Sequence, residues 1–104
     1  MKNTNFYYVS TWKNGNAENT KSTFGIRIRK ENFNRLKKWK EIKVGDKKII
    51  KTPKAKFTEK CPEIRNIIIK DFLMNKNLAD WKPYKPNKLK LYEIEKDKFE
   101  LRII

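Results

Sequence analysis

The chain has 104 residues, of which 27 are Lys or Arg and 12 are Asp or Glu, so its formal net charge at pH 7 is +15. A chain of this length builds one domain, residues 1–104, with a single modest core. Its single cysteine, Cys61, and the absence of histidine exclude an internal disulfide, His-ligated zinc and His-dependent catalytic triads. Without a signal peptide or a membrane-spanning run, we expect a cytoplasmic protein with no metal or cofactor.

The N-terminal third predicts two strands and a short helix. Residues 6–12, FYYVSTW, are rich in aromatic and β-branched side chains, as strands are. Residues 13–23 are polar and contain an Asn-Gly turn signal; they are either a plain connection or an arm with a function. Residues 22–29 alternate apolar with polar side chains, which predicts a strand with Arg27 and Arg29 on its outer face. A short helix is expected over residues 31–38.

Residues 40–52 predict a hairpin, because a Gly-Asp pair separates two short β-prone runs. The register stays open at this point. A two-residue loop pairs Ile42 with Ile49, whereas a three-residue loop pairs Ile42 with Ile50. Pro53 is expected to end the second strand, since proline cannot donate a hydrogen bond to a neighbouring strand.

Residues 61–77, CPEIRNIIIKDFLMNKN, are expected to form the central helix. Pro62 suits the first helical position, and Glu63 suits the positive end of the helix dipole. Apolar side chains would cover most of the helix circumference. We therefore expect this helix to be buried on most sides, with the rest of the chain around it.

The C-terminal part predicts an extended segment and a hairpin. Two prolines hold residues 80–86 extended. Residues 88–104 are expected to turn at a Lys-Asp pair, with Ile94 opposite Phe99 and Tyr92 opposite Leu101 on one apolar face. The complete pattern predicts an α+β domain: a small open antiparallel β-barrel or sheet of six to seven strands, with one short helix and one central buried helix.

The positive charge is concentrated in parts of the chain. Residues 35–60 carry eleven basic and three acidic side chains, and residues 82–92 carry four basic and no acidic ones. In contrast, residues 61–81 carry equal numbers of both. This segregation favours a basic face that binds a polyanion over an evenly solvated surface.

Lysines bind phosphates without reading sequence, whereas arginine can grip guanine, asparagine can address adenine, and aromatic rings can stack on unpaired bases. The candidate nucleic-acid-binding cations lie in predicted strands and basic loops: Lys21, Arg27, Arg29, Lys30, Lys51, Lys54, Lys56, Lys82 and Lys85. The candidates for base contact or stacking are Asn14, Asn16, Asn19, Trp81 and Tyr84. The two aromatic residues could instead cover an edge of the core, and the strand arginines could belong to an ordinary solvated face.

Two enzymatic alternatives are weaker. Residues 41–43 (EIK) and 46–48 (DKK) each fit half of a metal-dependent nuclease motif, but no further acidic residue occupies a suitable place. A ribonuclease that uses Lys, Arg and Tyr in place of histidine is the other alternative. We expect no catalysis.

The order of these segments resembles that of B3-like DNA-binding pseudobarrel domains. TFGIRIRKENFNRL, residues 23–36, resembles their opening strand and short helix, and EIKVGDKKIIK, residues 41–51, resembles the strand pair that follows. CPEIRNIIIKDFLMNKNL, residues 61–78, resembles their second helix, which leads into a final strand pair like KLKLYEIEKDKFELRI, residues 88–103.

This resemblance implies an open barrel, flanked by two helices, that grips the DNA major groove with two arms. One arm precedes and includes the strand at residues 24–29, and the other follows the strand at residues 47–51. The sequence therefore favours a non-catalytic nucleic-acid-binding domain, with double-stranded DNA preferred over RNA and no membrane partner. The alternative is a small interaction module or inhibitor that binds an acidic surface of a nucleic-acid enzyme.

Overall fold

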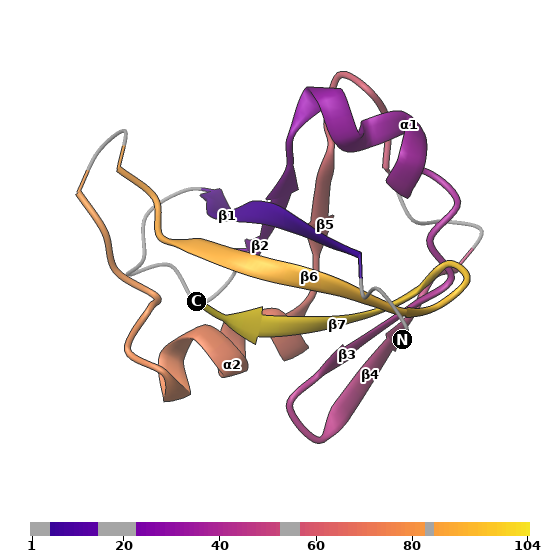
Figure 1. Cartoon of the computed structure of the whole chain (residues 1–104). Coiled ribbons are helices and arrows are strands. Elements are labelled where there is room, and N and C mark those ends of the chain that lie inside the picture. The colour runs from indigo at the N-terminus through magenta and orange to yellow at the C-terminus, as the bar shows by residue number, and fades with distance from the viewer. Residues whose placement is uncertain (1–4, 15–22, 53–56, 83–84) are drawn as a thin grey trace.

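The computed structural model describes residues 5–14, 23–52, 57–82 and 85–104 (Figure 1). The domain is α+β, as predicted. Its elements are β1 (Phe6–Asn14), β2 (Thr23–Ile28), α1 (Phe33–Leu36), β3 (Glu41–Val44), β4 (Lys47–Ile50), β5 (Glu63–Arg65), α2 (Ile67–Asn75), β6 (Lys88–Glu95) and β7 (Lys98–Ile103). A 3-10 turn, Lys30–Asn32, leads into α1.

The seven strands form one sheet in the order β4-β3-β7-β6-β1-β2-β5. The sheet is mixed rather than purely antiparallel, because β3 runs parallel to β7 while the other neighbours are antiparallel. It curls strongly into a half-barrel (Figure 1). Helix α2 packs across the open side of the half-barrel, against β2, β3 and β4.

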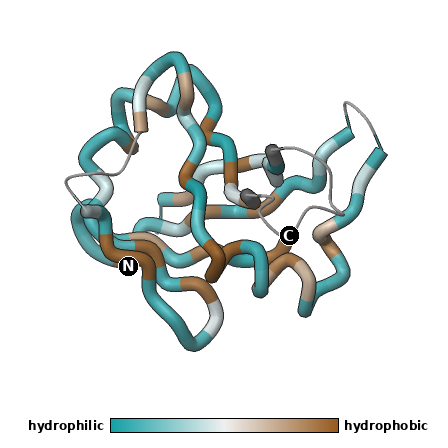
Figure 2. Tube along the Cα trace, turned by 180° about the vertical axis from the view of Figure 1, so that it is seen from behind, coloured by the Kyte–Doolittle hydropathy of each residue, from teal (hydrophilic) through white to brown (hydrophobic). Residues whose placement is uncertain are grey.

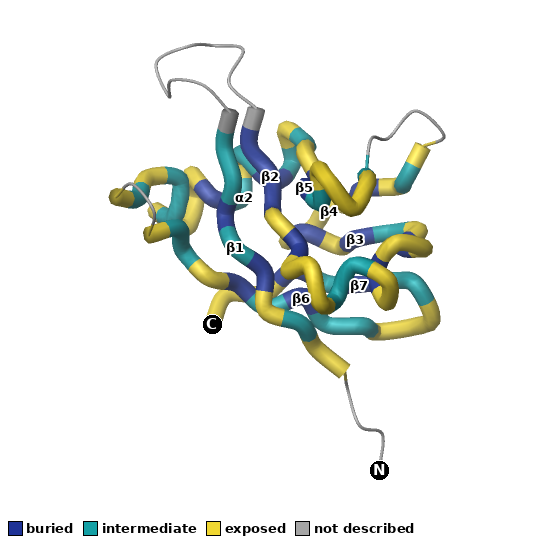
Figure 3. The backbone as a smooth tube through the Cα atoms, turned by 90° about the horizontal axis from the view of Figure 1, so that it is seen from above, coloured by how far each residue is buried: buried dark blue, intermediate teal, exposed yellow. Residues whose placement is uncertain are grey.

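The core lies between the inner face of this sheet and the helices. Buried and more exposed positions alternate along the strands (Figure 3). Hydrophobic residues are concentrated in the strands, whereas the hairpin tips are mostly hydrophilic (Figure 2). The buried apolar residues are Val9, Phe24, Ile26, Ile28, Leu36, Trp39, Ile42, Val44, Ile49, Ile64, Ile69, Leu73, Leu89, Leu91, Phe99 and Leu101.

The alternation predicted for the second strand is confirmed. Ile26 and Ile28 are buried, whereas Arg27 and Arg29 are exposed. The β3–β4 hairpin has the two-residue loop, with Ile42 opposite Ile49. Gly45 in this loop has φ of +62°, a conformation that glycine adopts without steric strain.

The central helix begins later than predicted. Pro62 is not its first residue; the Pro62 carbonyl accepts a hydrogen bond from the Ile28 N–H at 2.8 Å. The next three residues form the edge strand β5, and Asn66 caps α2 by accepting a hydrogen bond from the Ile68 N–H at 2.9 Å. Pairing with the free edge of β2, together with the strong Asn cap, outweighs the Pro-Glu helix-start signal.

Helix α2 is also less buried than predicted. Within α2, whose residues are all described, Ile69 and Leu73 are buried, whereas Ile67 is 65% exposed and Met74 is 57% exposed. A half-barrel covers one side of a helix, so the opposite side faces solvent. No helix in the described part of the chain is long and apolar enough to cross a membrane.

The register of the C-terminal hairpin differs from the prediction by one residue. Leu101 lies opposite Leu91 rather than Tyr92, and Phe99 does not lie opposite Ile94. The strand is irregular around Ile94, which is 47% exposed. Because a shift of one residue exchanges the two faces of a strand, Leu91 points into the core and Tyr92 points outward.

Gly25 allows β2 and β5 to approach closely. A Cβ atom at this position would lie 2.3 Å from the carbonyl oxygen of Ile64. We expect Gly25→Ala to force the strands apart and to lower the free energy of unfolding by about 3 kcal/mol. Urea denaturation followed by tryptophan fluorescence measures this change. The control, Ser10→Ala on β1, should change stability by less than about 0.5 kcal/mol. An equal stability of the two variants would contradict the close approach.

Candidate nucleic-acid interface

The side chains that alternate with the core residues form what we call the outer face of the sheet. Its aromatic members are Phe6, Tyr8, Trp12 and Tyr92. Its basic members on β2, β5, β6 and β7 are Arg27, Arg65, Lys88, Lys90 and Arg102. Of the four rings, Phe6 and Tyr8 are exposed, whereas Trp12 and Tyr92 are half-buried. Two acidic residues, Glu63 and Glu100, lie on the same face.

The rings and cations are in direct contact across β1, β6 and β7. Tyr8 lies opposite Lys90, which lies opposite Arg102. The Lys90 Nζ is 4.7 Å from the ring centroid of Phe6 and 5.7 Å from that of Tyr8, and the Arg102 Cζ is 4.3 Å from that of Tyr92. The Phe6 centroid is 5.5 Å from each of the other two ring centroids. These distances are typical of cation–π and aromatic pairs.

Trp12 extends the same arrangement towards the edge strand. It lies opposite Gly25, which in turn lies opposite Arg65. Since glycine has no side chain, Arg65 can reach across β2 and place its Cζ 4.5 Å from the Trp12 ring centroid. Gly25 thus serves both the close packing of the strands and the contact between a cation and a ring.

A basic depression lies beside this face at the end of β2. It has a volume of about 330 Å³ and is lined by Ser10, Arg27, Ile28, Arg29, Lys30, Lys60 and Pro62. Three of the predicted nucleic-acid-binding residues therefore come together there. Lys60 was not predicted, because its segment was expected simply to lead into a helix. A hydroxyl group among several cations is chemically suited to a phosphate.

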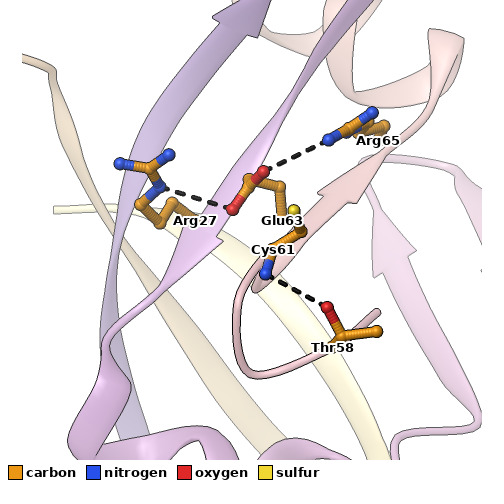
Figure 4. A network of polar contacts seen from close by, with 5 residues as sticks. All are labelled: Arg27, Thr58, Cys61, Glu63 and Arg65. Carbon is orange, nitrogen blue, oxygen red and sulfur yellow. Dashed lines mark hydrogen bonds and ion pairs between the residues drawn. The ribbon is translucent and has the colours of Figure 1, made fainter. Parts of the chain in front are cut away.

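Glu63 holds two of the cations in place (Figure 4). This carboxylate is 4% exposed; its Oε2 lies 3.5 Å from Arg27 Nε, and its Oε1 accepts a hydrogen bond from Arg65 Nη2 at 3.3 Å. Within the described residues Oε2 accepts no hydrogen bond, so its contact with Arg27 is an ion pair. The preceding turn is fixed by the Cys61 N–H, which donates to Thr58 Oγ1 at 3.1 Å.

Arg35 connects α1 to the sheet and is not part of the outer face. Its Nε donates to the Tyr7 hydroxyl at 3.0 Å, and its Nη2 donates to Glu93 Oε1 at 3.2 Å. The hydrogen bond to Tyr7, followed by electrostatic interactions with Tyr7 and Glu93, raises the pKa of Arg35 above its ordinary value.

Other predicted residues lie elsewhere. Lys51 donates to the Lys37 carbonyl at 2.8 Å and lies over the ring of Trp39. Trp81 packs edge-on against Phe24, with a centroid distance of 6.3 Å, and so covers an edge of the core.

Lys82 and Lys85 are exposed, and the Lys85 N–H donates to the Lys82 carbonyl. The predicted residues outside the described part of the chain are Lys21, Lys54, Lys56, Asn16, Asn19 and Tyr84. Of Asn14, the backbone in β1 is described but the side chain is not.

The acidic residues of the two nuclease-like patterns lie at opposite ends of the β3–β4 hairpin: Glu41 begins β3, and Asp46 lies in the turn. Glu41 lies 3.6 Å from Lys48, and Lys43 lies 3.8 Å from Glu100. Among the described residues, no three His, Cys, Asp or Glu side chains are grouped so that they could hold a metal ion.

We expect Glu63→Gln to destabilise the domain. The amide keeps the shape of the side chain but removes the negative charge between Arg27 and Arg65. The free energy of unfolding should fall by about 1–3 kcal/mol, the usual effect of removing one partner of a buried charged hydrogen bond. Thermal and urea denaturation measure this loss of stability. The matched control is Glu95→Gln, because Glu95 forms an exposed ion pair with Lys98. Equal effects of the two changes would show that Glu63 does not anchor the arginines.

Comparisons with protein-family models, with curated proteins and with solved structures find no match for this chain.

Proposed function

We propose that this chain is a non-catalytic nucleic-acid-binding domain that holds phosphates on the outer face of its sheet. The observation that carries the proposal is the convergence of Arg27, Arg29, Lys30 and Lys60 on one depression that also contains the Ser10 hydroxyl. Two of these cations also have carboxylate partners: Arg27 lies 3.5 Å from Glu63, and Arg29 lies 3.6 Å from Glu31. The depression therefore holds four cations against two carboxylates, and this positive excess favours a bound anion.

The cations continue from this depression across the sheet. Ser10 on β1 lies between Arg27 on β2 and Lys88 on β6, and Lys90 lies opposite Arg102 on β7. A phosphate backbone that crosses the strands can therefore meet a cation on each of β2, β6 and β7. Contacts of this kind release counterions and supply affinity without reading the sequence.

Double-stranded DNA is the first ligand to test, because its dense charge suits a domain with a net charge of +15. The B3-like arrangement of two arms remains part of the proposal. The arm at β2 includes Arg27 and Arg29, which line the depression. The arm after β4 includes residues 53–56, which lie outside the described part of the chain.

Fluorescence anisotropy with labelled duplex DNA, single-stranded DNA and RNA tests the proposal. At low ionic strength we expect binding, and we expect the affinity to fall steeply as salt is added. If none of the three nucleic acids binds at low salt, the proposal is wrong. A pull-down from nuclease-treated lysate would then test the sequence-based alternative of an acidic protein partner.

Substitutions in the depression should change the salt dependence. We expect Arg29→Ala and Lys60→Ala each to weaken binding to all nucleic acids alike and to reduce the slope of log affinity against log salt by about 1. Lys76→Ala, at the end of α2, is the matched control and should leave the slope unchanged. Equal slopes for all three variants would place the phosphate contacts elsewhere.

A further inference from the structure

We infer that the aromatic part of the outer face stacks on unpaired bases, so that the preferred ligand is a single-stranded nucleic acid rather than a duplex. The inference rests on the proposed binding of phosphates and changes its ligand: a single strand takes the place of the duplex that was named there as the first ligand to test. It is carried by Phe6, Tyr8 and Tyr92 together with the cations that lie over their rings.

The first step is the exposure of the rings. Phe6 and Tyr8 are each 41% exposed. At these positions β1 pairs with β6, whereas its pairing with β2 begins at Val9. Neighbouring exposed aromatic residues are unfavourable in water, and they commonly mark an interaction site. The core does not need these two rings, because the intervening residues Tyr7 and Val9 point to the inner side.

The second step is the partnership of each ring with a cation. Lys90 lies over Phe6 and Tyr8. Arg102 lies over Tyr92 and also donates a hydrogen bond from its Nε to Glu100 Oε1. A base that stacks on one of these ring faces takes the place of the cation that lies over it, and the displaced cation can then pair with the phosphate of that nucleotide. β-sheet proteins bind single strands in this way: aromatic rings stack on the bases, and neighbouring cations contact the phosphates.

The third step is the comparison of possible occupants. In a duplex the base faces are already stacked on one another, so the rings would gain no base contact. A second copy of the chain would bring Lys90, Arg102 and Arg27 against the same cations, and like charges disfavour that pairing. A single strand satisfies both the rings and the cations, and its negative charge complements the face.

The test compares a labelled oligothymidylate of about ten nucleotides, within the usual range of binding-site sizes, with a labelled mixed-sequence duplex. For the unmodified protein we expect tighter binding of the oligothymidylate at the same salt concentration. Replacing both Tyr8 and Phe6 by leucine keeps an apolar surface but removes the rings. This variant should bind the oligothymidylate about tenfold or more weakly, while its affinity for the duplex stays unchanged.

Two controls complete the design. Tyr8→Phe keeps a ring and should bind like the unmodified protein, and Ile67→Ala removes an exposed apolar group from α2 without an effect on binding. Circular dichroism checks the fold of each variant; if the double variant unfolds, the single variant Tyr8→Leu replaces it in the same comparison.

The outcomes separate this inference from the proposed function. Equal or tighter binding of the duplex, or unchanged oligothymidylate binding in the leucine variant, overturns the stacking role. If Lys60→Ala still weakens both ligands, the proposed phosphate binding stands. Failure of the unmodified protein to bind any nucleic acid overturns both. If sedimentation shows a dimer of the unmodified protein but a monomer of the leucine variant, the face binds a second copy of the chain, and the inference is wrong.

Discussion

The two-residue alternation of β1 is the constraint on which the rest of the structure depends. Val9 is 1% exposed and belongs to the core, whereas Tyr8, one residue earlier, is 41% exposed on the other face. Since β1 pairs with β2 on one side and β6 on the other, its register fixes which residues of both neighbours face inward. Burial of the inner side chains therefore places rings and cations together on the outer face, although those side chains contribute little to the core.

The edge strand β5 holds part of this surface in place. Glu63 is buried between Arg27 and Arg65, and the missing side chain of Gly25 lets Arg65 reach Trp12. A buried carboxylate normally requires cationic partners, so the stability of this edge and the position of its arginines are linked. The remaining cations of the depression line the same end of β2.

Local sequence patterns were enough to predict the α+β fold class. The start of α2 and the outer-face contacts depend on the pairing of distant segments, which local patterns do not show. The alternation around Arg27 needs only neighbours in sequence, and it is confirmed. The start of α2 was wrong because residues preceding Asn66 pair with β2, which is distant in sequence. The predicted register of the last hairpin was wrong because an irregularity at Ile94 cannot be read from hydrophobicity.

Tyr8 and Lys90 were missed as a pair because they come from strands at opposite ends of the chain. The alternation of side chains in FYYVSTW and KLKLYE was the available signal.

Mapping amide and aromatic NMR shifts during titration with a single-stranded oligonucleotide tests the central claim most directly. If the outer face binds nucleic acid, the largest changes will occur at Phe6, Tyr8, Lys90 and Arg102, with none at Met74 on α2. Changes centred on α2, or spread evenly over the surface, would contradict the account.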